Sequence, residues 1–257
     1  MTPKPGRLTN GGLLRKLAPG VATAGGVVAK PGPADDEFAE ARRRLIDQIE
    51  AEALDTRLWT GRARFSERVM AAMARVPRHA FVPPGEVSVA YVNRPLAIGH
   101  GQTISQPYIV AVMTDLLDLA ATDRILEIGS GCGYQTAVLA EVAGRVYSIE
   151  VIKDLATAAR RRLAELGYTN VEVRAGDGFQ GWPEEAPFDA VMVTAAAPRL
   201  PGVLVDQLKA RGRMVVPVGR PRATQILMLG VKQADGTLKT RKTLPVAFVP
   251  MVKGAGN

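Results

Sequence analysis

Apolar residues recur at helical spacing in three stretches of the first 120 residues. The first stretch predicts an amphipathic helix over residues 37–54. The second predicts a helix that begins near Ser66, a residue type favoured at helix N-caps. The third predicts a helix after Pro107. The apolar positions that define the three faces are Phe38, Leu45, Ile46 and Ile49, then Val69, Met70, Met73 and Val76, and finally Ile109, Val110, Met113, Leu116 and Leu117.

From residue 124 the pattern changes to short apolar runs separated by helical stretches. The runs are "RILEIG", "RVYSIE", "NVEVRAG", "FDAVMVTAAA" and "GRMVVPVG". Strands that alternate with helices predict an α/β fold with a doubly wound, mostly parallel sheet and helices on both faces. Two further runs, "TQILMLGV" and "LPVAFVPMV", have no long helix between them. They are predicted to form a hairpin at one edge of the sheet.

Composition changes this picture mainly at the N-terminus. The chain has a net charge of +8, and residues 1–34 contribute five of these charges without any acid. Their many glycines and prolines predict a disordered basic tail, and they interrupt any secretory signal. The only cysteine, Cys132, excludes an internal disulfide and favours a reducing, cytoplasmic compartment. The sequence contains no run of 18 apolar residues, so no membrane span is expected.

The stretch "ILEIGSGCGYQT" is the most informative motif. A predicted strand runs into Gly129, Gly131 and Gly133, and glycine allows a sharp turn and the close approach of a ligand. Three acids, Glu127, Glu150 and Asp177, end successive strands and should meet at the carboxyl edge of the sheet. An acid-lined pocket for a ribose and a positive charge fits the sulfonium S-adenosylmethionine. The alternative is that these acids only cap the following helices.

Residues 97–107, "AIGHGQTISQP", are too polar for a core segment, although a hydrophobic helix follows them. Pro107 fits the first turn of that helix, so Ser105 or Gln106 should lie at its N-terminus, where free N–H groups attract an anion. Thr103 and Ser105 add hydroxyl donors. The stretch is predicted to be a loop that holds an anionic substrate, and the alternative is a helix cap with no ligand.

Several segments together resemble the protein-L-isoaspartate (D-aspartate) O-methyltransferase family. The segments are "VPRHAFVP", "PLAIGHGQTISQPYIVAVM", "LEIGSGCGYQTAVLA", "VYSIE", "GDG", "FDAVMVTAAAP" and "VAFVPM", and the match spans about residues 40–253. The resemblance implies a Rossmann-like class I methyltransferase fold. It also implies an enzyme that uses S-adenosylmethionine to methylate the free carboxylate of L-isoaspartyl residues in age-damaged proteins and peptides, which initiates their repair.

The resemblance also implies roles for individual residues. Ser105 matches the active-site serine, and the neighbouring substrate-binding positions are His100, Gln102, Thr103 and Ile104. The positions expected to bind the cofactor are Glu127, Gly129, Gly131, Gly133, Glu150, Asp177 and Gly178, with Glu150 on the ribose and the last two on the adenine side. One position departs from the family, which commonly has Asp where this chain has Asn93.

With this resemblance the chain divides into a tail and one methyltransferase domain over residues 35–257. Residues 35–120 would form the helical part with the substrate loop, 121–220 the cofactor-binding core, and 221–257 the C-terminal strands.

An isoaspartyl α-carboxylate has a pKa of about 3.5, so it is ionised at neutral pH and needs no general base. Positioning and desolvation should therefore carry the reaction, and neither His79 nor a metal is expected to take part.

Two alternatives are open at this point. A nucleic-acid methyltransferase on the same sheet is disfavoured, because "TAAAP" offers neither an amide nor an acid after the fourth strand, and Cys132 lies in the cofactor turn. A binding protein without catalysis is disfavoured by the intact glycines and acids. We expect a monomer that acts on isoaspartyl proteins and peptides and binds neither nucleic acid nor membranes.

Overall fold

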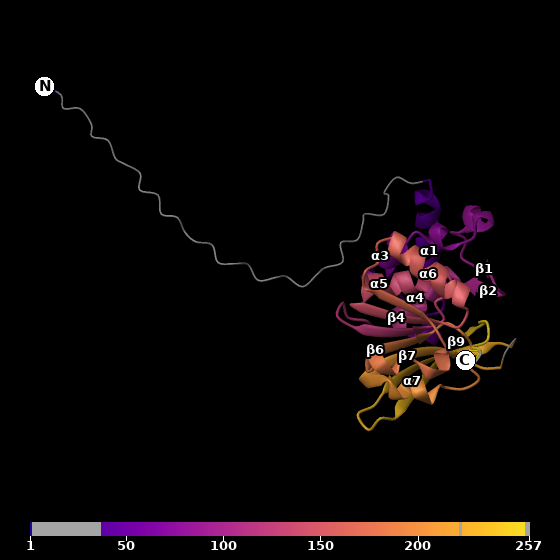
Figure 1. Cartoon of the computed structure of the whole chain (residues 1–257). Coiled ribbons are helices and arrows are strands. Elements are labelled where there is room, and N and C mark those ends of the chain that lie inside the picture. Colours follow the sequence, from indigo (N-terminus) through magenta and orange to yellow (C-terminus); the bar gives the residue numbers. More distant parts are fainter. Residues whose placement is uncertain (2–36, 221–222, 255–257) are drawn as a thin grey trace.

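A seven-stranded sheet forms the centre of the molecule. The computed structural model describes Met1 and residues 37–220 and 223–254. The strand order is β5-β4-β3-β6-β7-β8-β9, with parallel pairing from β5 to β7 and antiparallel pairing of β8 and β9 (Figure 1). The strands are β3 (Arg124–Ile128), β4 (Arg145–Glu150), β5 (Val171–Ala175), β6 (Phe188–Val193), β7 (Leu208–Val218), β8 (Gln225–Lys232) and β9 (Leu238–Val246). The predicted α/β fold with a mostly parallel sheet is confirmed.

The N-terminal helices lie close to their predicted positions. They are α1 (Ala39–Asp55), the short α2 (Arg57–Thr60), α3 (Glu67–Arg75) and α4 (Pro107–Leu116). Ser66 caps α3 as predicted, because its hydroxyl accepts the N–H of Val69 at 3.4 Å. The single apolar stripe predicted for α4 is wrong, since almost every residue of this helix is buried. The reason is that α4 packs on α1, α3 and α5.

Alternate residues of each strand enter two separate hydrophobic cores. Ile125 of β3 packs with α1, α3 and α4 and with α5 (Tyr134–Val142) and α6 (Lys153–Glu165). Leu126 packs on the opposite face against α7 (Gly202–Asp206) and the segment around the 3₁₀ helices η3 (Gly178–Gln180) and η4 (Pro183–Glu185). Figure 1 shows α1, α3, α4, α5 and α6 on one side of the sheet and α7 on the other. Both faces are therefore covered, but unequally.

The C-terminal strands differ from the prediction. The hairpin of β8 and β9 exists, but its second strand covers residues 238–246 and not "LPVAFVPMV". Most of β9 is an exposed edge strand with the polar sequence "LKTRKT", so its residues lack the apolar alternation that marks a half-buried strand. The apolar residues after it leave the sheet and cross to the end of β6, where Ala196 bonds Val249 and Met251 through its backbone at 2.8 Å each.

A second, two-stranded sheet stands beside the main one. Its strands are β1 (Leu96–Gly99) and β2 (Gln102–Ile104), which pair antiparallel. The 3₁₀ helices η1 (Arg78–Phe81) and η2 (Pro84–Val89) connect α3 to this hairpin. The basic tail of residues 1–34 lies, apart from Met1, outside the described residues. Within the described ranges, no helix is long and apolar enough to cross a membrane.

Replacing Ile49 with alanine should lower the free energy of unfolding by about 2–5 kcal/mol, because the Ile49 side chain is fully buried in the core that joins α1 to the sheet. Urea unfolding followed by circular dichroism measures the change. Leu58→Ala is the matched control, since Leu58 is 87% exposed and its loss should change stability by less than about 0.5 kcal/mol. A separate early transition in Ile49→Ala would show that the N-terminal helices fold independently of the sheet.

Candidate active site

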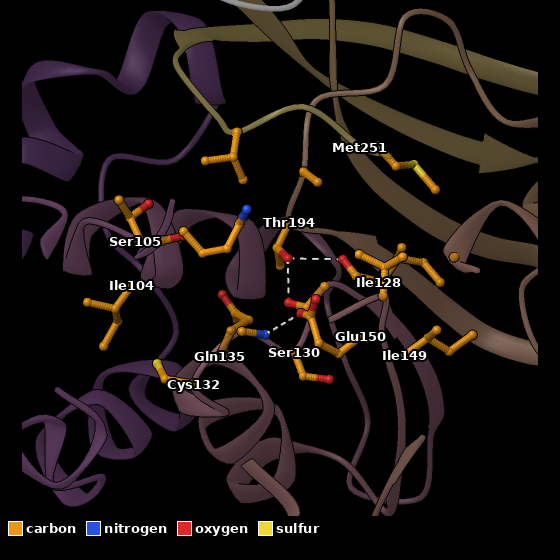
Figure 2. A pocket seen from close by; sticks show the side chains of 18 of the residues that line it. Ile104, Ser105, Ile128, Ser130, Cys132, Gln135, Ile149, Glu150, Thr194 and Met251 are labelled. Carbon is orange, nitrogen blue, oxygen red and sulfur yellow. Dashed lines mark hydrogen bonds between the residues drawn. The ribbon is translucent and has the colours of Figure 1, made fainter. Parts of the chain in front are cut away.

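A pocket opens at the carboxyl edge of the sheet, where the chain order reverses between β3 and β6. Its walls come from the turn after β3, the end of β4, the residues after β6, the β1–β2 hairpin and the C-terminal segment Val249–Val252. Figure 2 shows side chains from these elements around one space, with Ser105 and Ile104 on one side and Thr194, Ile128 and Glu150 toward the other. This is the place where open α/β sheets bind ligands.

The glycine-rich turn shapes the floor of the pocket. Gly129 and Gly131 have positive φ angles of 98° and 52°, and both line the pocket. A Cβ atom on Gly129 would lie 2.4 Å from Oγ1 of Thr194, so only glycine fits there. Gly133 also has a positive φ, but it is the N-cap of α5 and does not line the pocket. In this structure Gly133 shapes the turn, and its contact with a cofactor stays a prediction.

Glu150 presents a fixed carboxylate to the pocket. Its two oxygens accept the backbone N–H groups of Gly131 at 2.8 Å and of Ile152 at 3.0 Å. The side chain is only 6% exposed, and it lines the pocket. Each carboxylate oxygen keeps a further lone pair. Glu150 is therefore prepared to accept hydrogen bonds from a pair of hydroxyl groups such as those of a ribose.

Glu127 lies behind the pocket wall and not in it. Its side chain is fully buried, and the pocket lining does not include it. One oxygen accepts the hydroxyls of Thr136 and Ser148, and Ser148 also bonds Ser130, which does face the pocket, at 2.6 Å. The other oxygen has no partner among the described residues. Burial raises the pKa of Glu127 to about 7. The structure thus offers Glu127 no direct route to a cofactor, only one through the two serines.

Of the two neighbouring residues after β5, Gly178 lines the pocket and Asp177 does not. Gly178 lines the pocket, and a Cβ atom there would lie 2.3 Å from Cγ2 of Ile128, so the space is closed to any side chain. Asp177 instead accepts the N–H of Phe179 at 2.9 Å and caps η3, and it does not line the pocket. Asp177 therefore has the role that the sequence analysis gave as the alternative for the strand-end acids, which is to cap the following helix.

The polar stretch that was predicted to be a loop is the β1–β2 hairpin. His100 and Gly101 form its tip with positive φ angles of 53° and 69°, as a two-residue type I′ turn requires. Four of the predicted substrate residues line the pocket, namely Gln102, Thr103, Ile104 and Ser105. His100 is exposed at the tip and does not line it. His79 packs on Phe38 and bonds the Tyr91 hydroxyl, which is a structural role.

Asn93 explains how the helix after the hairpin is capped. Pro107 is the first residue of α4 and Gln106 its N-cap, as predicted. Asn93 Oδ1 accepts the N–H of Tyr108 at 3.0 Å, and its amide donates to Glu52 at 2.8 Å. An aspartate could accept at this site but could not donate, and it would oppose the Glu52 carboxylate. Asparagine therefore fits this chain because Glu52 faces position 93.

A second hollow adjoins the first. It is lined by Pro95, Gln106, Ile109 and Phe248, and it shares Thr103, Ser105, Thr194 and Val249 with the first pocket. The Ser105 hydroxyl has no hydrogen-bond partner among the described residues, whereas Thr194 Oγ1 donates to a carbonyl oxygen of the β3 turn. Ligands in the two hollows would therefore lie next to each other at Ser105 and Thr194, and group transfer requires two reactants in such proximity.

Several lining residues have no role in the sequence-based site. These are Thr194, Gln135 and the segment Val249–Val252. The "VAFVPM" match could have pointed to the last of them, but the apolar run was interpreted as a strand. Cys132 lines the pocket, and burial raises the pKa of its thiol, so it is a poor nucleophile there. No group of three or more histidine, cysteine or acidic residues able to hold a metal occurs within the described ranges.

Glu127 should make the stability of the protein fall as the pH rises from about 4.5 to 7. The folded state holds the proton of this carboxyl more tightly than the unfolded chain, because burial disfavours the charged form. The loss over this window should approach about 3 kcal/mol and should be absent in Glu127→Gln. Urea unfolding at a series of pH values tests this, with the exposed Glu172→Gln as control. Equal pH slopes in the wild type and Glu127→Gln would contradict it.

Comparisons with known proteins identify the family of this chain. The family model described as Protein-L-isoaspartate(D-aspartate) O-methyltransferase (PCMT) matches residues 50–256. The chain is 55% identical over 231 residues to Protein-L-isoaspartate O-methyltransferase 2 of Syntrophobacter fumaroxidans, covering 90% of this chain and 92% of the relative. It is 56% identical over 207 residues to the protein of the same name from Polaromonas sp., covering 80% of this chain and 98% of the relative.

Solved structures show the same fold. One named protein-L-isoaspartate O-methyltransferase superposes with a TM-score of 0.71 at 28% identity, covering 84% of this chain and 66% of the other. A second, a putative enzyme of that name from Plasmodium falciparum in complex with S-adenosyl-L-homocysteine, has a TM-score of 0.68 at 24% identity, covering 83% and 99%. With the family model matched over most of its length, this chain belongs to the protein-L-isoaspartate (D-aspartate) O-methyltransferase family.

Proposed function

We propose that this protein transfers a methyl group from S-adenosylmethionine to the free carboxylate of L-isoaspartyl residues in age-damaged proteins and peptides, and so initiates their repair. The observation that carries the proposal is the meeting of two hollows at Ser105 and Thr194, in a chain of this family. One hollow has the features of a nucleoside site, and the other lies beside the N-terminus of α4. Isoaspartyl-containing proteins and peptides are the partners that this function implies.

The first pocket fits S-adenosylmethionine on observations of this chain. The Glu150 carboxylate is held by two backbone N–H groups and keeps lone pairs for the ribose hydroxyls. Gly129, Gly131 and Gly178 line this pocket without side chains, so a ligand bound in it would lie against their backbone. Bound there, S-adenosylmethionine supplies a methyl group on a positively charged sulfur. We assign Glu150 to the ribose and Gly178 to the adenine side.

The second hollow would hold the isoaspartyl carboxylate. The Ser105 hydroxyl is free to donate to it, and Thr103 adds a second hydroxyl from the same strand end. Because the carboxylate is already ionised at neutral pH, the protein needs no base and contributes by aligning the two reactants and excluding water. The C-terminal segment, bonded to the backbone of Ala196, lines the first hollow with Val249–Val252, and Val249 also lines the second.

A nucleic-acid methyltransferase remains the less favoured alternative. Thr194, the first residue after β6, uses its hydroxyl on the backbone of the β3 turn and does not present an acceptor pair for a base amine. Methyl transfer from labelled S-adenosylmethionine to paired isoaspartyl and aspartyl peptides, and to RNA, decides between the two. Incorporation into the isoaspartyl peptide alone is expected.

We also propose that the protein is a monomer, which gel filtration tests. We propose a cytoplasmic location because the chain has a single cysteine.

Glu150→Ala should weaken cofactor binding by about 1.5–3 kcal/mol, because the ribose loses a charged acceptor. Titration calorimetry with S-adenosylhomocysteine measures this. Glu172→Ala is the matched control, since that carboxylate lies on the exposed face of β5 and pairs with Arg145. Unchanged affinity in Glu150→Ala would refute the ribose assignment.

Ser105→Ala should slow peptide methylation by an amount equivalent to about 2–4 kcal/mol, while affinity for S-adenosylhomocysteine stays nearly the same. The serine aligns the carboxylate, whereas the cofactor depends on Glu150 and the glycine turn. Ser88→Ala, an exposed position on η2, serves as control. The pH–rate profile between about pH 6 and 8 should keep its shape, since no proton is removed from the nucleophile. A lost titration in Ser105→Ala would instead place the serine in an acid–base relay.

A further inference from the structure

Arg78 is a fully buried charge that no assigned role explains. It begins η1, within the "VPRHAFVP" segment, and its relative exposure is 0%. Arginine is almost never fully buried without an acidic partner, because an uncompensated charge in the interior is costly. Among the ion pairs of the described residues, none involves Arg78. The charge must therefore have another reason to be there.

The guanidinium group is bonded only to neutral groups. Nε donates to the carbonyl of Ala90 at 2.9 Å, and Nη2 donates to the carbonyls of Ser105 at 2.8 Å and Arg94 at 3.4 Å. The group lies over the Tyr134 ring, 4.8 Å from its centroid. Nη1 has no hydrogen-bond partner. The contacts tie η2 and the segment before β1 to the end of β2, but they leave a net positive charge.

This charge persists at neutral pH. Burial lowers the pKa of Arg78 from its ordinary value, while the nearby phenol and thiol groups oppose that shift. A guanidinium starts so far above neutrality that it stays protonated in proteins. Its field in the interior is also less screened than that of a surface arginine.

Ser105 links this buried charge to the junction of the two hollows. Its carbonyl is bound to Arg78, and its side chain lines both hollows. We infer that Arg78 is a positioning residue that holds Ser105 in place and supplies the positive field that favours an ionised substrate carboxylate at Ser105. The inference rests on the proposed function, because that function supplies the anion.

A purely structural arginine would make a different prediction. The three carbonyl bonds alone would affect folding and the position of Ser105, but they would not distinguish a charged ligand from a neutral one. A buried positive charge within several ångströms favours an anion over an isosteric neutral group by roughly tenfold or more at the effective dielectric constant of protein sites. The selectivity for charge therefore separates the two roles.

The probes are two peptides that differ in one group. The first contains an isoaspartyl residue with its free α-carboxylate, and in the second the same group is a carboxamide. Titration calorimetry on the protein saturated with S-adenosylhomocysteine gives the dissociation constant of each peptide without turnover. In the wild type, the carboxylate peptide should bind roughly tenfold or more tightly than the carboxamide peptide.

Three variants test whether the preference for the carboxylate peptide comes from the charge of Arg78. Arg78→Gln should bring the ratio of the two dissociation constants close to one, whereas Arg78→Lys should keep most of it, since lysine retains the charge. Arg68→Gln is the matched control, because Arg68 also donates to two backbone carbonyls, those of Leu119 and Val142, but lies on the exposed side of α3. It should leave the ratio unchanged. Affinity for S-adenosylhomocysteine should be similar in all the proteins.

The outcomes separate this inference from the proposed function. A wild type that methylates the isoaspartyl peptide, together with an Arg78→Gln protein that keeps the full ratio, overturns the inference and leaves the proposed function standing. A wild type that neither methylates nor binds the peptide overturns both. Should Arg78→Gln fail to fold, Arg78→Lys decides: a retained ratio supports the role of the charge, and a ratio near one contradicts it. Equal binding of both peptides by the wild type also contradicts it.

Discussion

The contact between Thr194 and the turn after β3 is the constraint on which the site depends. Thr194 Oγ1 lies 2.4 Å from the place of a Gly129 Cβ atom and bonds the carbonyls of Ile128 and Gly129 at 2.9 and 2.6 Å. This joins the ends of β3 and β6, the strands between which the sheet reverses its order. The turn so fixed directs the Gly131 N–H to Glu150, and both carboxylate oxygens are held before any ligand arrives.

The opposite side of the site depends on the half-buried Asn93 and Glu52 and the fully buried Arg78. Asn93 caps α4 and faces Glu52, while Arg78 bonds the backbone on both sides of β1 and β2. These contacts fix Ser105 through its backbone and leave its hydroxyl for a ligand. The same division occurs at Glu127, whose carboxyl is fully buried and acts on the pocket only through Ser148 and Ser130. At Arg78 and Glu127 a fully buried ionisable side chain lies behind the wall and bonds residues that line the pocket or are linked to its lining.

Two short segments close the space between these sides. The β1–β2 hairpin supplies Thr103 and Ser105, and the C-terminal segment supplies Met251 and its neighbours (Figure 2). Neither belongs to the central sheet. The sheet alone would leave the carboxyl edge open to water, and enclosing the reactants is the contribution that methyl transfer to an ionised carboxylate requires. The chain therefore completes the site with one segment that precedes the central sheet and one that follows it.

The sequence by itself determined the alternation of strands and helices from β3 to β6, the glycine turn, the cap at Ser66 and the helix start at Pro107, because these follow from local periodicity and local backbone preference. Only the tertiary structure decided which strand-end acid lines the pocket. Glu150 does, whereas Glu127 is buried and Asp177 caps its own 3₁₀ helix. It also decided that β9 is a polar edge strand and that residues 249–252 cover the pocket. The reason is that side-chain direction and long-range pairing depend on neighbours distant in the chain, and no local pattern encodes them.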